Sequence, residues 1–306
     1  MPKGRGEREE QRSAPVQPRE NRPNEEFSSS GSGGSATLTP TQAQSCTVTV
    51  NSVEALQQAL KQAQSNNRDD VICIQAGNYL VTSTLTYSTP NGDGGKKLTI
   101  RAVGGEVVLD GNYYVQMMRI ETGNNDTGAD VTIDGIRFQN GKATHGGGLY
   151  VKTSRGNITL TNNTFSNNAG SDGGGAYARL TSGSVALTNN TFSNNAGSSG
   201  GGAYASGSSV NLTNNTFNGN KNGGAYALGY RVALANNIFS NNTGGGAYVS
   251  SYSGTVVLTG NTFFNNTTQQ NGGGAYVSLS ANQAIANIYN NIFWQNTANT
   301  GGRRWR

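Results

Sequence analysis

The sequence predicts an all-β fold, a parallel β-helix of about eight coils with an N-terminal capping α-helix. Two short phrases alternate along residues 145–293. One has glycines, a small residue and tyrosine, as in Asp172–Tyr177, and the other reads Leu-Thr-Asn-Asn-Thr-Phe, as in Leu160–Phe165. The phenylalanines that end the second phrase are 22 to 30 residues apart: Phe165, Phe192, Phe217, Phe239, Phe263 and Phe293. A repeat of this length is typical of a solenoid whose coils stack to share one core.

The apolar runs within each repeat alternate in the manner of β-strands. In Val185–Leu187 two aliphatic residues flank a small one, so the outer two are predicted to point into the core. In Ala203–Ala205 the same period points the alanines inward and Tyr204 outward. Each coil is therefore predicted to contain three short strands and three turns.

Asparagine and glycine exchange at the corner that follows the aliphatic strand. Both residues tolerate positive φ, so the corner is predicted to be a left-handed turn. Its members are Gly111, Gly135, Asn162, Asn189, Asn214, Asn236, Gly260 and Asn290. The next asparagine in each repeat is predicted to stack on its equivalents about 4.8 Å apart along the axis. This asparagine ladder comprises Asn163, Asn190, Asn215, Asn237, Asn261 and Asn291.

Residues 53–64 have the spacing of an amphipathic α-helix, with Ser52 at the N-cap position. A helix at this place would cover the first coil and protect its unpaired strand edges. Cys46 and Cys73 fall in the strands predicted on either side of the helix. They form either a disulfide or two buried thiols, and two cysteines alone predict no structural metal site.

The Gly-Gly-Ala-aliphatic and Phe-x-x-Asn phrases resemble the passenger repeats of polymorphic outer-membrane proteins, although tyrosine follows Gly-Gly-Ala here. Residues 46–300 as a whole resemble the right-handed parallel β-helix of the pectate-lyase-like superfamily. That resemblance implies a right-handed parallel β-helix with an α-helical cap at its N-terminal end. The superfamily contains lyases, hydrolases, adhesins and spacers, so the fold alone does not select an activity.

The chain is predicted to have three parts. Residues 1–45 are charged and rich in Pro, Ser and Gly, which predicts a disordered tail. Residues 46–302 form the β-helix domain, and residues 303–306 form a basic tip with three arginines. No secretory signal peptide and no transmembrane segment are predicted. The resemblance nevertheless implies an extracellular or cell-surface location.

Catalysis by the mechanisms of the superfamily needs carboxylates gathered at one place. The resemblance implies that pectate lyases use calcium-binding aspartates with an arginine base, and that polygalacturonases use three close aspartates. Residues 131–300 contain only two acidic residues. The candidate catalytic residues are Asp110, Asp134, Arg119, Arg137, His145 and Asp172. No cofactor is predicted, except calcium if the lyase alternative holds.

Two pairs among these candidates are predicted to stack on adjacent coils. Asp110 and Asp134 both precede glycine, and two carboxylates about 4.8 Å apart would split their pKa values as an acid/base pair requires. The competing interpretation is that each aspartate fastens a turn. His145 and Asp172 share the position before the glycines, where they form either a polarising pair or an ordinary polar turn.

The candidate binding surface is an outward column of tyrosines, each beside a glycine that is predicted to leave its ring uncovered. Its members are Tyr150, Tyr177, Tyr204, Tyr226, Tyr248 and Tyr276. Flat aromatic faces with polar rims suit sugar rings and protein surfaces. The alternative is a self-stacked ladder that only stabilises the sheet, with each pair worth roughly 0.2 to 1 kcal/mol.

The leading hypothesis is a non-catalytic surface or extracellular module that binds polysaccharide or a cell-surface protein through the tyrosines. The alternatives are a polysaccharide lyase or glycoside hydrolase, and a structural spacer or adhesin stalk. The formal charge of +5 is spread thinly along the chain, so nucleic-acid binding is not predicted.

Overall fold

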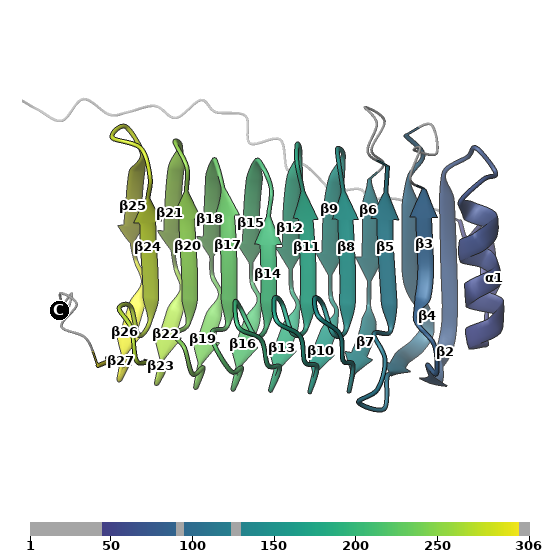
Figure 1. Ribbon diagram of the computed structural model, residues 1–306, viewed down its shortest axis with the longest axis horizontal. Helices are drawn as coiled ribbons and strands as arrows, with labels where there is room; N and C mark the ends of the chain where they lie inside the picture. The colour runs from purple at the N-terminus through teal and green to yellow at the C-terminus, as the bar shows by residue number, and fades with distance from the viewer. Residues whose placement is uncertain (1–44, 90–94, 124–129, 300–306) are drawn as a thin grey trace, which may run out of the picture. The chain divides into compact units, whose positions relative to one another are not determined.

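The computed structural model describes residues 45–89, 95–123 and 130–299. These residues belong to one compact unit, Gln44–Arg306. Its strands lie side by side along one axis, with a helix at one end, so that the described residues form a solenoid (Figure 1). The basic tip of residues 303–306 lies outside the described residues, and so does the predicted tail apart from Ser45.

The strands form three parallel sheets. The larger sheet has 17 strands: β1 (Val48–Val50), β2 (Asp70–Leu80), β4 (Leu98–Asp110), β6 (Val131–Asp134), β7 (Ile136–Gln139), β9 (Asn157–Thr161), β10 (Thr164–Ser166), β12 (Ser184–Thr188), β13 (Thr191–Ser193), β15 (Ser209–Thr213), β16 (Thr216–Asn218), β18 (Arg231–Ala235), β19 (Ile238–Ser240), β21 (Thr255–Thr259), β22 (Thr262–Phe264), β25 (Ile285–Tyr289) and β26 (Ile292–Trp294). The second sheet has eight strands: β3 (Leu85–Thr89), β5 (Met118–Thr122), β8 (Leu149–Thr153), β11 (Ala176–Leu180), β14 (Ala203–Ser206), β17 (Ala225–Gly229), β20 (Ala247–Ser251) and β24 (Ala275–Leu279). A short third sheet pairs β23 (Thr267–Thr268) with β27 (Thr297–Ala298).

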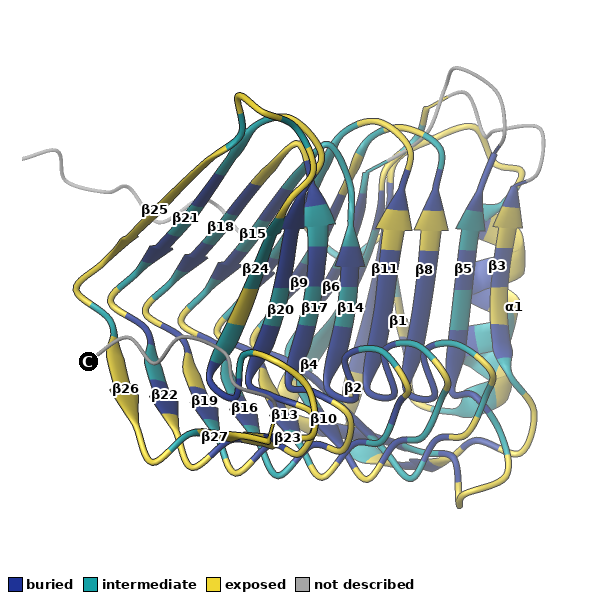
Figure 2. Ribbon diagram, turned by 60° about the vertical axis from the view of Figure 1, so that its left-hand side comes forward, coloured by how far each residue is buried: buried dark blue, intermediate teal, exposed yellow. Residues whose placement is uncertain are grey.

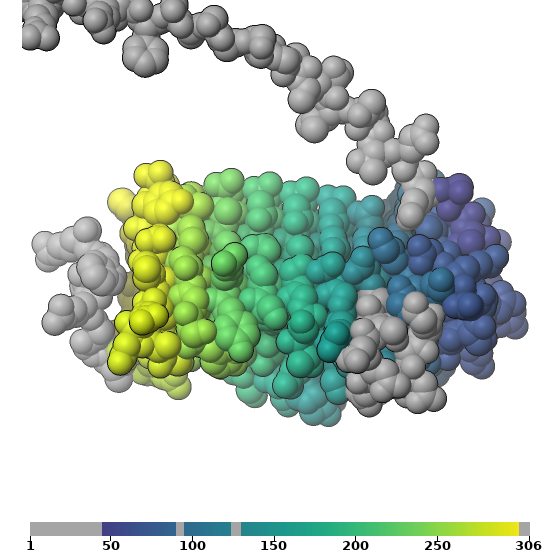
Figure 3. Space-filling view, turned by 90° about the horizontal axis from the view of Figure 1, so that it is seen from above, coloured from purple at the N-terminus to yellow at the C-terminus, as the bar shows by residue number. Residues whose placement is uncertain are grey.

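Each coil runs from one strand of the eight-stranded sheet through two strands of the larger sheet and back by a loop. Successive coils form parallel bands in the space-filling view (Figure 3). Equivalent residues of the repeats face one another across every pair, as Phe165 faces Phe192 and Tyr177 faces Tyr204. The eight strands of the second sheet match the predicted number of coils.

The core consists of stacked columns of identical or similar side chains, whereas strands β25 and β26 of the last coil are exposed (Figure 2). Val185 and Leu187 are fully buried, as their alternation predicts. The phenylalanines form an inner ladder in which neighbouring ring centroids lie 4.7 to 5.1 Å apart: Phe138, Phe165, Phe192, Phe217, Phe239, Phe263 and Phe293. Stacking of equal side chains lets the core extend by one coil without a change in packing.

The corner asparagines have the predicted left-handed conformation, with φ of 57° at Asn162 and 56° at Asn189. Gly111 is an exception to the predicted column. The strand β4 spans both strand positions of its coil, so Leu109 faces Phe138 and Asp110 faces Gln139. Gly111 therefore belongs to the next corner, opposite Asn140, and its predicted alignment with Gly135 is wrong.

The predicted asparagine ladder is confirmed. Asn190 Oδ1 accepts hydrogen bonds from the backbone N–H and the Nδ2 of Asn163 at 2.9 and 3.1 Å, while Asn190 Nδ2 donates to Leu160 O at 2.8 Å. A second ladder with the same geometry follows the phenylalanines: Asn168, Asn195, Asn220, Asn242, Asn266 and Asn296. The Phe-x-x-Asn phrase contains this second ladder, which was not predicted from the sequence.

The last glycine of each Gly-Gly-Ala phrase is required by a close approach between coils. A Cβ at Gly175 would lie 2.5 Å from the carbonyl oxygen of Gly202, and one at Gly202 would lie 2.4 Å from that of Gly224. The loop therefore enters the eight-stranded sheet where no side chain fits.

The helix α1 (Val53–Ala63) covers the N-terminal end of the solenoid, as predicted (Figure 1). Ala55 N–H donates to Ser52 Oγ at 3.1 Å, and Leu56 and Leu60 are buried. Cys46 and Cys73 form a disulfide with a Cα–Cα distance of 5.7 Å, so the alternative of two buried thiols is wrong. Among the described residues, no helix is long and apolar enough to cross a membrane.

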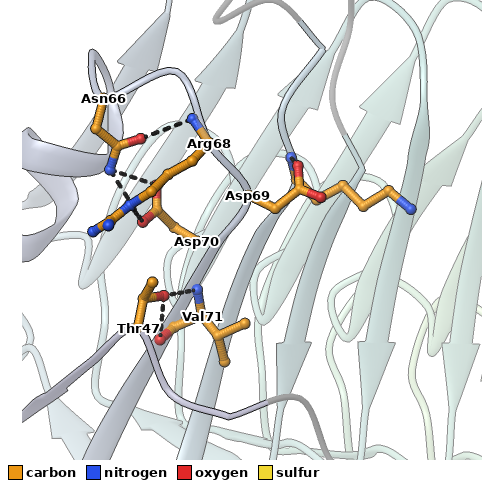
Figure 4. A network of polar contacts seen from close by, with 7 residues as sticks. Thr47, Asn66, Arg68, Asp69, Asp70 and Val71 are labelled. Carbon is orange, nitrogen blue, oxygen red and sulfur yellow. Dashed lines mark hydrogen bonds and ion pairs between the residues drawn. The ribbon is translucent and has the colours of Figure 1, made fainter.

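A polar network joins the end of α1 to β2 (Figure 4). Asn66 Nδ2 donates to both carboxylate oxygens of Asp70, at 3.1 and 2.9 Å, and Arg68 Nε lies 3.3 Å from Asp70 Oδ1. Lys97 N–H donates to Asp69 Oδ1 at 2.9 Å, which extends the network to the next coil. These contacts provide hydrogen-bond partners for the buried carboxylate of Asp70 and connect the end of the helical cap to the first coils.

Candidate binding face

The outer face of the eight-stranded sheet carries the predicted tyrosines in one column. Strand pairing places Tyr150, Tyr177 and Tyr204 directly opposite one another on β8, β11 and β14. The column continues through Tyr226, Tyr248 and Tyr276 on β17, β20 and β24. The period of two therefore places the tyrosines outward, as the sequence predicts.

The tyrosine rings form an outer ladder that is stacked on itself. Neighbouring centroids lie 4.2 to 5.5 Å apart, and the planes differ by 3° to 22°. Tyr150 and Tyr177 are each only 6% exposed, and Tyr276 at the last coil is 36% exposed. The prediction that each ring face lies uncovered is wrong, because the neighbouring ring fills the space that a ligand ring would need.

Arg119 occupies the ladder position on the preceding coil and covers the first tyrosine. Its guanidinium carbon lies 4.1 Å from the centroid of the Tyr150 ring, and its Nη2 lies 2.8 Å from Glu121 Oε1. The Tyr150 hydroxyl donates to the same carboxylate oxygen at 3.3 Å. Burial, followed by the negative charge of Glu121, raises the pKa of Tyr150 to about 12. The outer ladder thus begins with the cation–π contact between Arg119 and Tyr150 and with the ion pair between Arg119 and Glu121.

A second outward column lies two residues further along each strand. It contains the exposed cations Lys152 and Arg179 in the early coils, and Ser206, Leu228 and Ser250 in the later ones. The nearby Tyr177 side chain raises the pKa of Arg179. The face is therefore cationic at one end and uncharged at the other.

Two exposed tyrosines that the sequence analysis did not single out lie beside the later coils. Tyr230 and Tyr252, in the turns that follow β17 and β20, are 55% and 52% exposed, and their rings meet edge to face at 6.3 Å. Burial raises the pKa of Tyr226 to about 12, and a smaller contribution comes from Tyr252, which lies near the outer ladder. Their position directly after an Ala-Tyr strand was the available signal.

A recess on the loop side is lined only by uncharged residues: Ser198, Asn222, Thr243, Gly244, Thr267, Thr268, Gln269, Gln270, Thr297 and Asn299. It lies where the loops of residues 219–224 and 241–246 are shorter than the preceding loop of residues 194–202. Amide and hydroxyl groups of this kind both donate and accept hydrogen bonds.

The structure does not stack Asp110 on Asp134. Asp110 faces Gln139, whereas Asp134 faces Thr161 on one side and Arg101 on the other. Burial raises the pKa of Asp110, but hydrogen bonds from Asn112 N–H and from the Gln139 and Asn140 side chains outweigh it and leave the pKa below its ordinary value. This carboxylate fastens a turn, which was the competing interpretation.

His145 and Asp172 do face each other on adjacent coils, as predicted. His145 Nδ1 lies 3.0 Å from Asp172 Oδ2, but the two atoms lack the alignment of a hydrogen bond. The His145 ring packs against Tyr177 with centroids 5.3 Å apart. The pair thus borders the outer ladder.

The remaining candidates are each engaged elsewhere. Arg137 Nη1 pairs with Glu106 at 2.9 Å on the larger sheet, and Arg119 pairs with Glu121 on the smaller one. Within residues 45–89, 95–123 and 130–299, no three His, Cys, Asp or Glu side chains gather in a group that could hold a metal ion. The six predicted catalytic residues therefore do not form one constellation.

The coil geometry defines the class of the protein as a parallel β-solenoid with a helical cap. Residues 120–297, more than half of the 306-residue chain, match the family model described as a right handed beta helix region. The chain belongs to the right-handed β-helix family, which confirms the predicted fold class. No curated protein and no solved structure matches the chain.

Proposed function

We propose that this β-helix is a non-catalytic module that binds polysaccharide through the outer face of the eight-stranded sheet. The observation that carries the proposal is the exposed edge-to-face pair of Tyr230 and Tyr252 beside the outer ladder. Half-exposed tyrosines present an apolar ring and a polar tip together, which suits the C–H faces and hydroxyl groups of sugars. Their rings take the contact role that the sequence analysis gave to the stacked column.

The outer ladder supports this role through the regular position of its rings along the solenoid and not through uncovered ring faces. The ladder position recurs once in every coil from Tyr150 to Tyr276, and Tyr276 at the last coil is more exposed than Tyr150 and Tyr177. The more exposed rings of the later coils offer successive sugar units of an extended polymer the same kind of contact. We therefore expect the polymer to follow the solenoid axis, with its tightest contact at Tyr230 and Tyr252.

The Cys46–Cys73 disulfide supports placing the protein outside the cell or at the cell surface. Disulfides persist in oxidising compartments and are rare in the cytosol of most organisms. Polysaccharides are also encountered at that location. The proposal for location and the proposal for ligand therefore agree.

A structural spacer or adhesin stalk is the second candidate function. The observation in its favour is the self-stacking of the outer ladder, because cross-strand aromatic pairs stabilise a sheet without any ligand. The polysaccharide lyase or glycoside hydrolase alternative has no comparable support, because the candidate carboxylates do not meet.

The test is retention of the full chain in gels that contain a panel of polysaccharides. The variant Tyr230→Ser/Tyr252→Ser should lose most of the retention while its melting temperature stays near that of the parent, since both side chains are half exposed. Tyr113→Ser/Tyr114→Ser is the matched control, because those tyrosines are 57% and 81% exposed elsewhere.

Equal retention of both double variants would contradict the proposed surface. Absence of retention on every polymer would favour the spacer. Release of unsaturated sugar products that disappears in Asp110→Asn/Asp134→Asn would establish the lyase alternative instead.

A further inference from the structure

Two cations stand side by side at the early end of the binding face. Lys152 on β8 and Arg179 on β11 are direct cross-strand partners in a parallel pair. Both side chains are exposed, and both point to the same side of the sheet as the outer ladder. Neighbouring strands lie about 4.8 Å apart. Like charges placed directly opposite each other destabilise a sheet, so this arrangement is unfavourable in the absence of an anion.

The carboxylate nearest in register does not neutralise this pair. Glu121 is the cross-strand partner of Lys152 on the preceding coil. Its Oε1 is instead held by Arg119 at 2.8 Å and by the Tyr150 hydroxyl at 3.3 Å. Among the described residues, neither Lys152 nor Arg179 forms an ion pair with a carboxylate. Arg119 and Glu121 pair with each other, and the two cations of the second column remain beside the outer ladder.

We propose that Lys152 and Arg179 bind the carboxylate or sulfate groups of an acidic polysaccharide. The inference rests on the proposed function and names the ligand class for its cationic end. Arg179 lies two residues after Tyr177 on β11, so its side chain leaves the sheet on the same side as the ladder. A planar guanidinium matches an oxyanion with paired N–H groups, and the neighbouring ammonium adds a second charge-assisted contact. The acidic groups of the polymer occupy this end of the face, while its uncharged parts reach Tyr230 and Tyr252.

The same face is poorly suited to a nucleic acid. Single strands bind where bases stack on aromatic faces along a continuous positive groove. Here the ladder rings are stacked on one another at 4.2 to 5.5 Å. The second outward column changes to Ser206, Leu228 and Ser250 after Arg179, so the positive charge ends after two coils. Two cations suit a polymer with spaced acidic groups better than one with a phosphate at every unit.

The experiment measures binding of the full chain to matched pairs of polymers at two salt concentrations. Polygalacturonate is compared with its methyl ester, and dextran sulfate with dextran, so that carboxylate and sulfate are tested on unchanged backbones. We expect the acidic member of at least one pair to bind about tenfold or more tightly at low salt, and high salt to abolish most of that difference. The pair that shows the difference identifies the anion.

Three variants separate a site from general charge. Lys152→Gln/Arg179→Gln should lose the preference for the acidic polymer. Lys142→Gln/Lys221→Gln removes the same charge from two exposed loop lysines and should keep the preference. Lys152→Arg/Arg179→Lys keeps both charges and should also keep most of the preference for the acidic polymer. Equal melting temperatures of the variants would show that all of them fold.

The outcomes distinguish this inference from the proposed function. Equal binding of the acidic and neutral polymers would overturn the anion site and leave polysaccharide binding intact. Equal losses in the two glutamine variants would also overturn it, because the attraction would then follow net charge. Tighter binding of single-stranded DNA than of any acidic polysaccharide would overturn it in favour of nucleic acid. Failure of every polymer to bind would remove the proposed function itself.

Discussion

The two aromatic ladders have the same periodicity but lie in different surroundings. Phe192, Phe217 and Phe239 are fully buried and stack at 4.7 and 4.8 Å. The outer ladder is less regular, with centroids 5.5 Å apart between Tyr204 and Tyr226 and 4.2 Å apart between Tyr226 and Tyr248. Strand pairing fixes both ladders, so pairing alone does not explain the difference.

The ring spacing of the outer ladder differs from that of the inner ladder because the outer strands follow loops of different length. The inner ladder lies on short strands such as β13 and β16, which are flanked on both sides by asparagine ladders. The outer tyrosines lie two residues after loops of varying length, and the widest gap falls where the shorter loop of residues 219–224 enters the sheet. Buried hydrogen bonds thus fix the ring spacing of the inner ladder, whereas the ring spacing of the outer ladder varies at the surface.

The largest expected effect is at the inner ladder. Phe217→Ala removes a fully buried ring that contacts two others and leaves a cavity between coils. We expect the free energy of unfolding to fall by about 3 to 5 kcal/mol, measured by urea denaturation. A loss below that of Tyr204→Ala would contradict the contrast between the ladders.

The next effect tests the buried hydrogen bonds beside the inner ladder. Asn220→Ala leaves the N–H of Asn195 without its Oδ1 acceptor at 3.0 Å and the carbonyl oxygen of Phe192 without its Nδ2 donor at 3.0 Å. Unsatisfied buried groups of this kind cost about 1 to 3 kcal/mol each. Denaturation should show a loss of that order, whereas the more exposed Asn211→Ala should change stability little. Equal effects of the two variants would show that the ladder adds nothing.

A smaller effect is expected at the outer ladder. Tyr204→Ala removes two stacking contacts, with Tyr177 and Tyr226. Cross-strand pairs contribute roughly 0.2 to 1 kcal/mol each, so the loss should be about 1 kcal/mol. Thermal unfolding measures it, with Tyr113→Ala as the exposed control. A loss as large as that of Phe217→Ala would show that surface stacking carries the fold.

The last expected effect is a loss of stability that is confined to high pH. Burial raises the pKa of Tyr150 and Tyr226 to about 12, above the value near 10 of an unfolded tyrosine. Below pH 10 both states are protonated and this contribution to stability is fully present. As pH rises from about 10 to about 12 the unfolded chain ionises first, so stability falls.

Ultraviolet titration of tyrosinate and denaturation at several pH values measure this dependence. Tyr226→Phe should reduce the loss between pH 10 and 12, because phenylalanine does not ionise. Titration of every tyrosine near pH 10 would contradict the raised pKa values.

The repeated part of the fold could be predicted because identical residues occupy identical positions. The Asn162 corner, the Asn163 ladder and the inward Val185 and Leu187 follow from local rules of turn and strand that do not depend on distant residues. The α1 cap was predictable for the same reason. In these coils, local preference and tertiary pairing agree.

The early coils could not be aligned from sequence. The strand β4 carries no asparagine corner and runs through two strand positions, so a shared Asp-Gly dipeptide suggested the wrong register for Asp110. Covering of the tyrosine faces was predicted only as the alternative of a self-stacked ladder, because an outward aromatic column is compatible with either arrangement. The Lys152 and Arg179 pair could have been found from the repeat that aligned Tyr150 with Tyr177, because each cation lies two residues after its tyrosine.

The direction of hydrogen bonding in the asparagine ladders has an evolutionary consequence. Each side-chain oxygen accepts from the coil before it, and each side-chain amide donates both to the coil before it and to the coil after it, so the same contacts recur at every junction between coils. Duplication or deletion of one whole repeat would leave all other contacts unchanged. Such a lineage can lengthen or shorten its surface by recombination, and can vary its loops without redesigning its core.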